Sequence, residues 1–224
     1  MKVGIVGDRG HSQVVRNIVG FHGIHQISVF NPKRCDSIHH VTSFEDLLES
    51  DCVMICSPNH THAEYLHKIV ERKYAGYVMC EKLPVTKSED LKLFDKLDPK
   101  KTMFNFNLRH SDLGKIVKKL SSSWQLGEPV SCSMELTHGL AFRPSFESSW
   151  RSDSKEILYT VGSHLIDFVG SCIGKIDQNS ARSYYARFSG EIDTCTTQGK
   201  LIHTDTTFNL IASSAVVNFS LPRL

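Results

Sequence analysis

The sequence predicts an α/β fold in two parts, a doubly wound parallel sheet followed by a smaller α+β domain. Short apolar runs alternate with amphipathic helical segments through the first half of the 224-residue chain. These runs show no polar alternation, which is typical of parallel strands covered on both faces. After Phe106 the rhythm changes to one strong helical segment among several strand-like ones.

The first half contains apolar runs rich in Val, Ile, Met and Phe, and we expect strands over 2–6, 26–30, 52–56, 76–80 and 102–106. Helical patterns lie between them, over 12–19, over 44–49 after Ser43 as a candidate N-cap, over 61–73, and from Thr86 or Ser88 through Phe94. Strand and helix in repetition predict a Rossmann-type sheet.

The second half predicts a helix laid on a mixed or antiparallel sheet. A linking helix is expected over 113–120, a half-buried strand over 130–137, a helix over 157–169, and strands over 181–188, 200–203 and 206–219, joined by turns at Gly190 or Gly199. The boundary is expected between residues 108 and 125. This gives a Rossmann-like domain over 1–118 and an α+β domain over 119–224; their roles in binding dinucleotide, substrate or a second copy are implied by the family resemblance given below.

Composition excludes several classes of partner. A net charge of +2 gives no strong field, which argues against nucleic acid. No apolar run approaches the ~20 residues that cross a bilayer. The seven cysteines are scattered without a Cys-x-x-Cys pair, and Met1 leads directly into a strand without a secretory segment. Reduced thiols and a cytoplasmic location are therefore expected.

The turn after the first expected strand reads Gly7-Asp8-Arg9-Gly10-His11-Ser12. A dinucleotide fingerprint needs glycine here, so that backbone amides can approach a pyrophosphate at the helix N-terminus. Gly7 fits the tight turn, Arg9 and Ser12 occupy the other two glycine positions, and Gly10 restores flexibility. The place between strand and helix favours nucleotide binding over an ordinary turn with a solvated Asp8.

The second strand ends at Asn31, and Lys33 and Arg34 follow. An acidic residue at this place would accept the ribose hydroxyls of NAD. Asn31 carries no charge, whereas Lys33 and Arg34 could meet a 2′-phosphate, so NADP is favoured over NAD. A polar loop with two solvated cations remains the alternative.

The third strand ends at Ser57-Pro58-Asn59-His60-Thr61-His62. Pro58 stiffens the turn, and Ser57 and Asn59 could bond ribose or phosphate oxygens. His60 and His62 fall on different sides of a helix, and no cysteine or carboxylate completes a metal set. We expect no metal, and histidines that cap the helix or lie on the surface.

The fourth strand runs into Glu81 and Lys82. A carboxylate and an ammonium are therefore expected at the carboxyl edge of the sheet, where open parallel sheets bind ligands.

A helix in the second half carries Thr160, His164 and Asp167 at i, i+4 and i+7, so they are expected on one face. A histidine there could relay a proton. A buried histidine held by a backbone carbonyl, with Asp167 as a structural partner, remains open.

Together these segments resemble the glucose–fructose oxidoreductase, inositol dehydrogenase and rhizopine-catabolism (Gfo/Idh/MocA) family. The likeness includes the opening turn, the Ser57–His62 and Glu81-Lys82 segments, and three further segments: Asn107-Leu108-Arg109, Trp150-Arg151 and Gly162-Ser163-His164-Leu165-Ile166-Asp167. The resemblance implies a nucleotide-binding domain and a C-terminal sheet that covers the active site and forms oligomers.

The resemblance also implies site residues. Lys82 matches a lysine that contacts the nicotinamide ribose and the reacting oxygen, and His164 matches the acid–base histidine. Catalytic candidates are Lys82, His164 and Thr160. Cofactor-binding candidates are Gly7, Asp8, Arg9, Gly10, His11, Asn31, Lys33, Arg34, Ser57, Pro58, Asn59, His62, Glu81, Lys82, Arg109, Trp150 and Arg151.

The sequence departs from the family at several positions. Thr160 stands where the family has an aspartate, and threonine cannot carry charge. Leu83 stands where proline follows the lysine, and Ser154-Lys155-Glu156 replaces a glycine-rich segment. Relatives continue through more strands beyond Leu224, so the second domain is expected to be truncated or reduced.

The function expected from these residues is hydride transfer between NAD(P) and a sugar, cyclitol or sugar nucleotide. Lys82 would stabilise the developing alkoxide and His164 would move the proton, with Thr160 and Asp167 orienting it. The alternative, motivated by Arg9 and Thr160, is a catalytically silent nucleotide- or sugar-binding protein that acts as a sensor or assembly partner.

Overall fold

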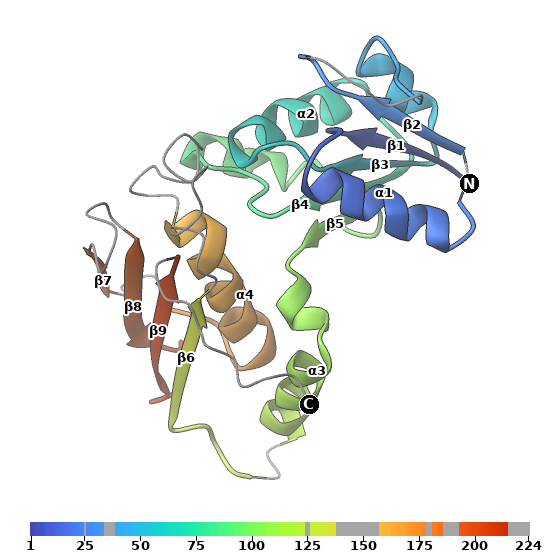
Figure 1. Ribbon diagram of the computed structural model, residues 1–224. Helices are drawn as coiled ribbons and strands as arrows, with labels where there is room; N and C mark the ends of the chain where they lie inside the picture. Colours follow the sequence, from blue (N-terminus) through green and yellow to red (C-terminus); the bar gives the residue numbers. More distant parts are fainter. Residues whose placement is uncertain are drawn as a thin grey trace, which may run out of the picture. The chain divides into compact units, whose positions relative to one another are not determined.

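The computed structural model describes residues 1–24, 26–33, 39–123, 126–137, 157–177, 181–185 and 193–214. The chain divides into two compact units, Met1–Asn105 and Phe106–Leu224. Each unit has its own sheet and its own helices, and each is described by itself (Figure 1).

The first unit is built on a five-stranded sheet in the order β2-β1-β3-β4-β5. Its strands are β1 (Lys2–Val6), β2 (Gln26–Phe30), β3 (Cys52–Ile55), β4 (Tyr77–Glu81) and β5 (Thr102–Asn105). Every pairing is parallel. The expected parallel sheet is confirmed, with strand ends that differ from the prediction by one residue or not at all.

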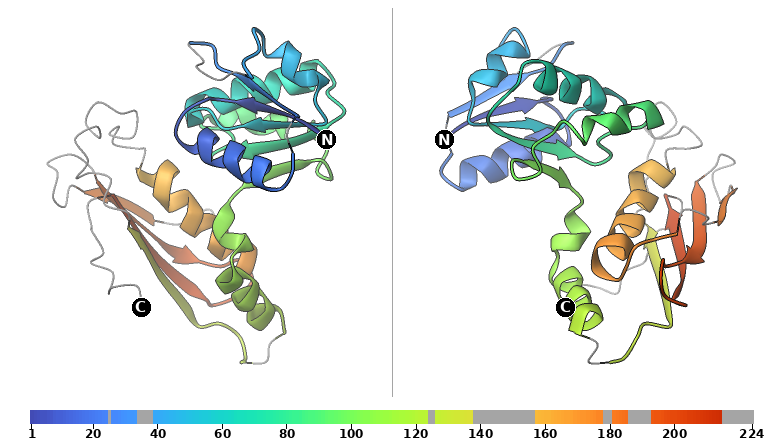
Figure 2. Two further views of the ribbon diagram at one scale, coloured as in Figure 1. Left: turned by 45° about the vertical axis from the view of Figure 1, so that its right-hand side comes forward. Right: turned by 180° about the vertical axis from the view of Figure 1, so that it is seen from behind.

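Helices cover both faces of this sheet (Figure 2). They are α1 (His11–Phe21), α2 (Asn59–Glu71) and the short 3₁₀ helices η1 (Glu45–Glu49) and η2 (Ser88–Leu93). One core lies between the sheet and α2, η1 and η2, and includes Phe44, Leu47 and Leu66, which are at most 1% exposed. A second core packs Val15 and Val19 of α1 on the other face. Burying one such side chain contributes about 1.5–3 kcal/mol.

The sequence correctly placed helical segments at η1 and η2, but they are 3₁₀ rather than α-helical. In η1 the Leu47 N–H donates to the Phe44 carbonyl, three residues back, over 3.0 Å. Segments of five and six residues are too short for a run of α-helical bonds. The candidate cap Ser43 exchanges bonds with Asp46: the Asp46 N–H donates to the Ser43 hydroxyl, and the Ser43 N–H donates to the Asp46 carboxylate.

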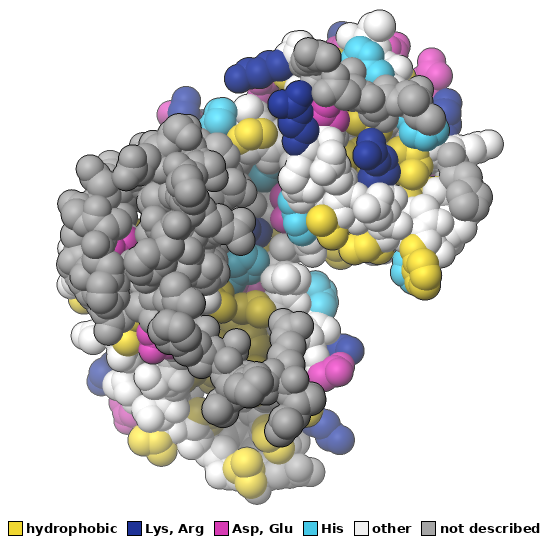
Figure 3. Space-filling view, in the orientation of Figure 1, with side chains coloured by type: hydrophobic (Ala, Val, Ile, Leu, Met, Phe, Trp, Pro, Cys, Tyr) yellow, Lys and Arg dark blue, Asp and Glu magenta, His cyan; other side chains and the backbone are white. Residues whose placement is uncertain are grey.

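Three of the outward-facing residues of α1 are hydrophobic. Val14, Ile18 and Phe21 are 50%, 53% and 87% exposed. Figure 3 shows such side chains gathered along the edge of the first unit where α1 runs. None of the helices in the described part of the chain is long and apolar enough to cross a bilayer.

The second unit has a four-stranded sheet in the order β6-β9-β8-β7. Its strands are β6 (Ser131–Thr137), β7 (Ala181–Tyr185), β8 (Thr194–Lys200) and β9 (Thr207–Ser213). β6 pairs with β9 in parallel, and the other two pairings are antiparallel. The expected mixed sheet is thereby confirmed. Before β6 come the 3₁₀ helix η3 (Asn107–His110) and helix α3 (Asp112–Ser123).

A helix packs on one face of this second sheet (Figure 2). It begins as a π-helix, η6 (Leu158–Gly162), and continues as α4 (Ser163–Cys172). Val161, Leu165 and Val169 are at most 1% exposed and form a core with the sheet residues Phe208 and Leu210. The helix expected over 157–169 is therefore present, but its first turns are wider than α-helical turns.

The strand expected over 200–203 is wrong. β8 ends at Lys200, and the residues around His203 form a turn, in which His203 has a positive φ of 67°. Gly199, expected in a turn, lies inside β8. The sequence of β8 is polar and threonine-rich, so it did not look like a strand. It is nevertheless a central strand, because β7 and β9 pair with both of its edges.

Candidate functional site

The carboxyl ends of β1 and β3 form the topological switch point of the first sheet. From β1 the chain adds β2 on one side and then returns to add β3 on the other. In open parallel sheets, ligands bind outside the carboxyl ends at such a point. The expected site residues of the first unit therefore lie at the edge where this fold binds ligands.

Two glycines shape the turn between β1 and α1. Gly7 has a φ of 106°, and a Cβ there would lie 3.1 Å from the Cys56 carbonyl oxygen. Gly10 has a φ of 58° and precedes the first residue of α1. Within the described residues no side chain caps this helix, so no side-chain oxygen accepts from its first amides at the positive end of the helix dipole. This is the environment that a pyrophosphate requires.

Asp8 is buried, and the alternative of a solvated Asp8 is wrong. The residue is 7% exposed, and the Asn31 amide at the end of β2 donates to its Oδ1 over 2.5 Å. The Lys33 N–H donates in turn to the Asn31 amide oxygen over 3.1 Å. Arg9 and Lys33 are exposed. Arg34 lies outside the described residues.

The turn after β3 carries an unsatisfied donor. Asn59 is 6% exposed, and its Nδ2 donates to no acceptor among the described residues. A buried amide without an acceptor costs free energy, which a bound acceptor would recover. Ser57 accepts from the Thr61 hydroxyl over 2.7 Å, and Pro58 precedes the first residue of α2. The residues at this edge thus fit a dinucleotide with ribose and phosphate oxygens.

His62 is fully buried, at 0% exposure, so the expectation of a capping or surface histidine is wrong. Its Nδ1 lies 2.8 Å from the Leu83 carbonyl oxygen, and its Nε2 lies 2.6 Å from the Ser57 carbonyl oxygen. One imidazole therefore ties the turn after β3 to the turn after β4. Burial lowers its pKa, although both carbonyls and Glu81 act in the opposite direction. Both ring nitrogens thus face backbone carbonyls, and a contact between His62 and a cofactor stays a prediction.

Glu81 and Lys82 lie at the carboxyl end of β4, as expected. Glu81 accepts from the Asn105 amide over 2.7 Å, and its carboxylate lies 3.0 Å from His11 Nε2. The ends of β4, β5 and α1 thus meet at one carboxylate. Lys82 is partly buried, and the peptide bond that joins it to Leu83 is cis.

The cysteines beside this edge carry no charge at neutral pH. Burial raises the pKa of Cys56 to about 12, and it raises the pKa of Cys80 well above its usual range. Because the thiolate is the reactive form of cysteine, neither residue is a nucleophile here.

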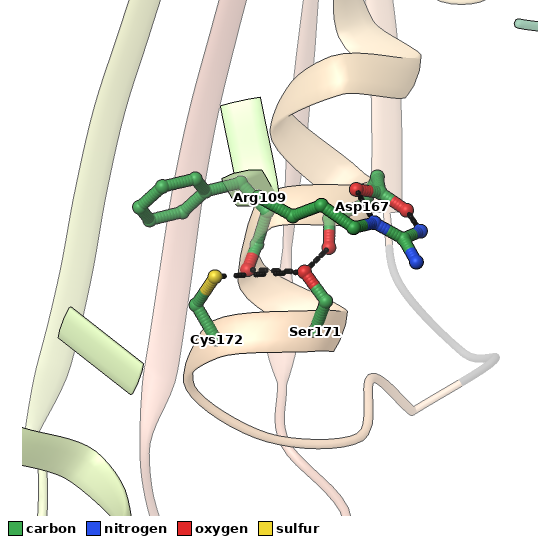
Figure 4. Close-up of polar contacts among 5 residues, drawn as sticks. Arg109, Asp167, Ser171 and Cys172 are labelled. Carbon is green, nitrogen blue, oxygen red and sulfur yellow. Dashed lines mark hydrogen bonds and ion pairs between the residues drawn. The ribbon is translucent and has the colours of Figure 1, made fainter. Parts of the chain in front are cut away.

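In the second unit, Arg109 and Asp167 form an ion pair with two contacts (Figure 4). Arg109 Nε donates to Asp167 Oδ2 over 2.8 Å, and Arg109 Nη2 donates to Asp167 Oδ1. The Ser171 hydroxyl donates to the Asp167 backbone carbonyl over 2.7 Å. The Asp167 carboxylate holds Arg109, and the expectation that Asp167 orients His164 stays a prediction.

His164 packs edge-on against Phe106, with ring centroids 6.3 Å apart. The Arg109 guanidinium lies over the same Phe106 ring at 5.3 Å. Thr160 lies in the π-helix η6, whose wider turns change its angular position relative to His164 from that expected of an α-helix.

The remaining candidates divide between the units. Trp150 and Arg151 lie outside the described residues. Lys82 belongs to the first unit, and His164 belongs to the second. That they face one another across one cleft stays a prediction.

The sequence analysis missed two residues that contact the candidate site residues. Asn105 ends β5 and bonds Glu81, and Phe106 stacks with both His164 and Arg109. Asn105 had a usable signal, because it is the last polar residue of an expected strand whose end adjoins Glu81.

Comparison with known proteins finds one family model that matches the first unit. Residues 3–103 match the model of an oxidoreductase family with an NAD-binding Rossmann fold, the Gfo/Idh/MocA family. The N-terminal unit is therefore similar to this family. The match covers nearly all of that unit, and the strand tips described above lie within it or directly beside it. No curated protein matches the sequence.

Solved structures share the fold over almost the whole chain. The WlbA dehydrogenase from Bordetella pertussis, in complex with NADH and UDP-GlcNAcA, has a TM-score of 0.76 at 16% identity, over 99% of this chain and 74% of its own. UDP-N-acetylglucosamine 3-dehydrogenase GnnA from Acidithiobacillus ferrooxidans has a TM-score of 0.76 at 19% identity, over 97% and 70%.

A protein from Desulfitobacterium hafniense, whose name describes it as an NADPH-dependent oxidoreductase, has a TM-score of 0.80 at 14% identity, over 96% and 67%. At such identities the likeness shows a common fold. The cofactor and substrate of this chain must therefore be inferred from its own residues.

Proposed function

We propose that the protein is an NAD(P)-dependent oxidoreductase that acts on an alcohol or ketone of a sugar, cyclitol or sugar nucleotide. The observation that carries this proposal is the buried Asn59 amide, which lacks an acceptor beside the glycine turn of a unit similar to an NAD-binding family. The cofactor is a nicotinamide dinucleotide. The cations Lys33, which is exposed, and Arg34 favour NADP over NAD. The buried Asp8 carboxylate favours NAD over NADP.

The nicotinamide supplies or accepts the hydride when the cofactor is bound. Lys82 stabilises negative charge on the reacting oxygen, as a preorganised cation does in a site from which water is excluded. His164 takes up or returns the proton of that oxygen. Thr160 provides a neutral hydrogen-bonding group in the turn before His164. Arg109 contacts substrate or cofactor only through the guanidinium N–H groups that its ion pair with Asp167 does not use.

The structural neighbours support the substrate class. WlbA was crystallised with a sugar nucleotide, and the name of GnnA gives UDP-N-acetylglucosamine as its substrate. A nucleotide sugar or a related polyol is therefore the first class to test. A homo-oligomer formed through the sheet of the second unit stays a prediction.

The test is Lys82→Ala, assayed by the near-ultraviolet absorbance of reduced nicotinamide with a panel of sugars, cyclitols and UDP-sugars. The matched control is Lys87→Ala, which removes a lysine whose side chain is 70% exposed. We expect Lys82→Ala to lower kcat by about 10²–10³-fold. We expect cofactor affinity to change little, and the control to keep full activity.

Full turnover in Lys82→Ala would refute the role of Lys82. If the parent protein binds dinucleotide tightly but turns over no substrate in the panel, it is a silent sensor. If it binds neither NAD nor NADP, the proposal is wrong.

A further inference from the structure

We propose that the Asp8 carboxylate makes this site select NAD over NADP. This inference rests on the proposed function and deepens it, because it names the dinucleotide that the site accepts. The sequence had pointed the other way, since the expected position for an acid, Asn31, carries no charge. In the structure the acid comes from the neighbouring turn.

The geometry places Asp8 at the tip of β2 although it follows β1. Val6 and Phe30, the last residues of β1 and β2, are paired in register, and the Gly7 N–H donates to the Phe30 carbonyl over 2.8 Å. Asp8 and Asn31 therefore emerge side by side, and the Asn31 amide donates to Asp8 Oδ1 over 2.5 Å. The end of β2 is where this fold receives the adenosine ribose of a dinucleotide.

Asn31 orients the carboxylate and does not replace it. Its Nδ2 is engaged by Asp8, and its Oδ1 accepts the Lys33 N–H. The amide is thereby held with its donor toward Asp8. The group that distinguishes NAD from NADP is the Asp8 carboxylate. It accepts hydrogen bonds from the ribose hydroxyls of NAD and repels the phosphate that NADP carries at the same position.

The described cations beside Asp8 in the two turns, Arg9 and Lys33, are exposed, so solvent and salt screen their charges. Asp8 is 7% exposed, and its charge is screened less. Arg34 lies outside the described residues, and Arg34→Ala measures its contribution directly. A carboxylate at the phosphate position opposes NADP, and we expect the Kd for NADP to exceed that for NAD by about tenfold or more.

The experiment is calorimetric titration of the full chain with NAD and with NADP, for the parent protein and for Asp8→Asn. This substitution keeps the shape of the side chain and removes its charge. The control is Glu49→Gln, which removes a charge beside Lys2 at the amino end of β1, the opposite edge of the sheet. We expect Asp8→Asn to lower the NADP/NAD ratio of Kd values about tenfold, and Glu49→Gln to leave it unchanged.

Salt dependence of the parent protein provides a test that needs no variant to fold. Repulsion between Asp8 and the 2′-phosphate is screened by salt, so the NADP/NAD ratio of Kd values should fall as ionic strength rises. Tighter binding of NADP by the parent protein would overturn the inference. An unchanged ratio in folded Asp8→Asn, as judged by circular dichroism, would also overturn it. Absence of binding for both dinucleotides would instead contradict the proposed function.

Discussion

His62 should control the position of Lys82 through one of its two ring nitrogens. The ring is 0% exposed and lies between the Leu83 carbonyl, 2.8 Å from Nδ1, and the Ser57 carbonyl, 2.6 Å from Nε2. Asparagine can place its amide nitrogen near the position of Nδ1, and glutamine can place its amide nitrogen near that of Nε2. His62→Asn therefore keeps the contact with Leu83, and His62→Gln keeps the contact with Ser57.

The expected magnitudes follow from the contacts that each variant loses. A buried carbonyl left without a donor costs about 1–3 kcal/mol. A neutral imidazole has a single N–H, so it donates to only one of the two carbonyls. His62→Ala should therefore lower the free energy of unfolding by about 1–3 kcal/mol, and of His62→Asn and His62→Gln the variant that keeps that donor should lose less. Of these two variants, only His62→Gln loses the contact with the carbonyl of Leu83, the residue after Lys82. Its kcat should be lower than that of His62→Asn by about tenfold, which equals about 1.4 kcal/mol in the barrier.

The assay combines urea unfolding with steady-state kinetics. Unfolding is followed by far-ultraviolet circular dichroism and by fluorescence, because a chain with two units need not unfold in a single transition. Equal kcat values for the asparagine and glutamine variants would refute the assignment of Lys82 positioning to His62. A loss of less than about 1 kcal/mol in His62→Ala would refute its role in joining the two turns.

Two further predictions concern stability. Because burial lowers the pKa of His62 in the folded state, its contribution is fully present above the unfolded pKa of about 6.5 and is lost as the pH falls towards the folded value, at up to about 1.4 kcal/mol per pH unit. Urea titrations across this range should show that loss for the parent protein and a smaller one for His62→Gln; the same pH dependence in both would exclude His62 as its source. Asp167→Ala should cost about 1–3 kcal/mol of unfolding free energy, less than a fully buried pair because Arg109 is 36% exposed. A double-mutant cycle with Arg109→Ala should show coupling, and purely additive losses would mean that the pair contributes nothing.

The sheet of the first unit could be predicted because local signals agree there with the tertiary structure. All five strands are apolar without alternation, and each is followed by a polar turn. The same pattern placed Gly7, Ser57 and Glu81 at one edge. In the second unit β8 was missed, since its burial comes from pairing on both sides and not from its own composition.

Contacts between distant segments could not be predicted. Asp8 is hydrogen-bonded to Asn31, 23 residues away, and Asp167 is paired with Arg109, 58 residues away. Hydrophobic periodicity predicts neither pair, because it does not indicate which group a polar side chain will bond. His62 was misassigned for the same reason: both of its partners are backbone carbonyls, which every residue has.

The π-helix η6 also had no sequence signal. Thr160, His164 and Asp167 have the spacing of one α-helical face, and the register is changed by the wide turns over Leu158–Gly162. Such insertions in a helix are frequent at functional sites. The departure from regular geometry therefore falls beside the histidine to which the proposal gives the proton.

A crystal structure of the full chain with NAD bound tests the central claim most directly. We predict the pyrophosphate at the N-terminus of α1 between Gly7 and Gly10, the adenosine ribose within hydrogen-bonding distance of Asp8, and the Asn59 amide donating to the dinucleotide. Saturating NAD found elsewhere, with the carboxyl ends of β1 and β3 covered by protein alone, would contradict it.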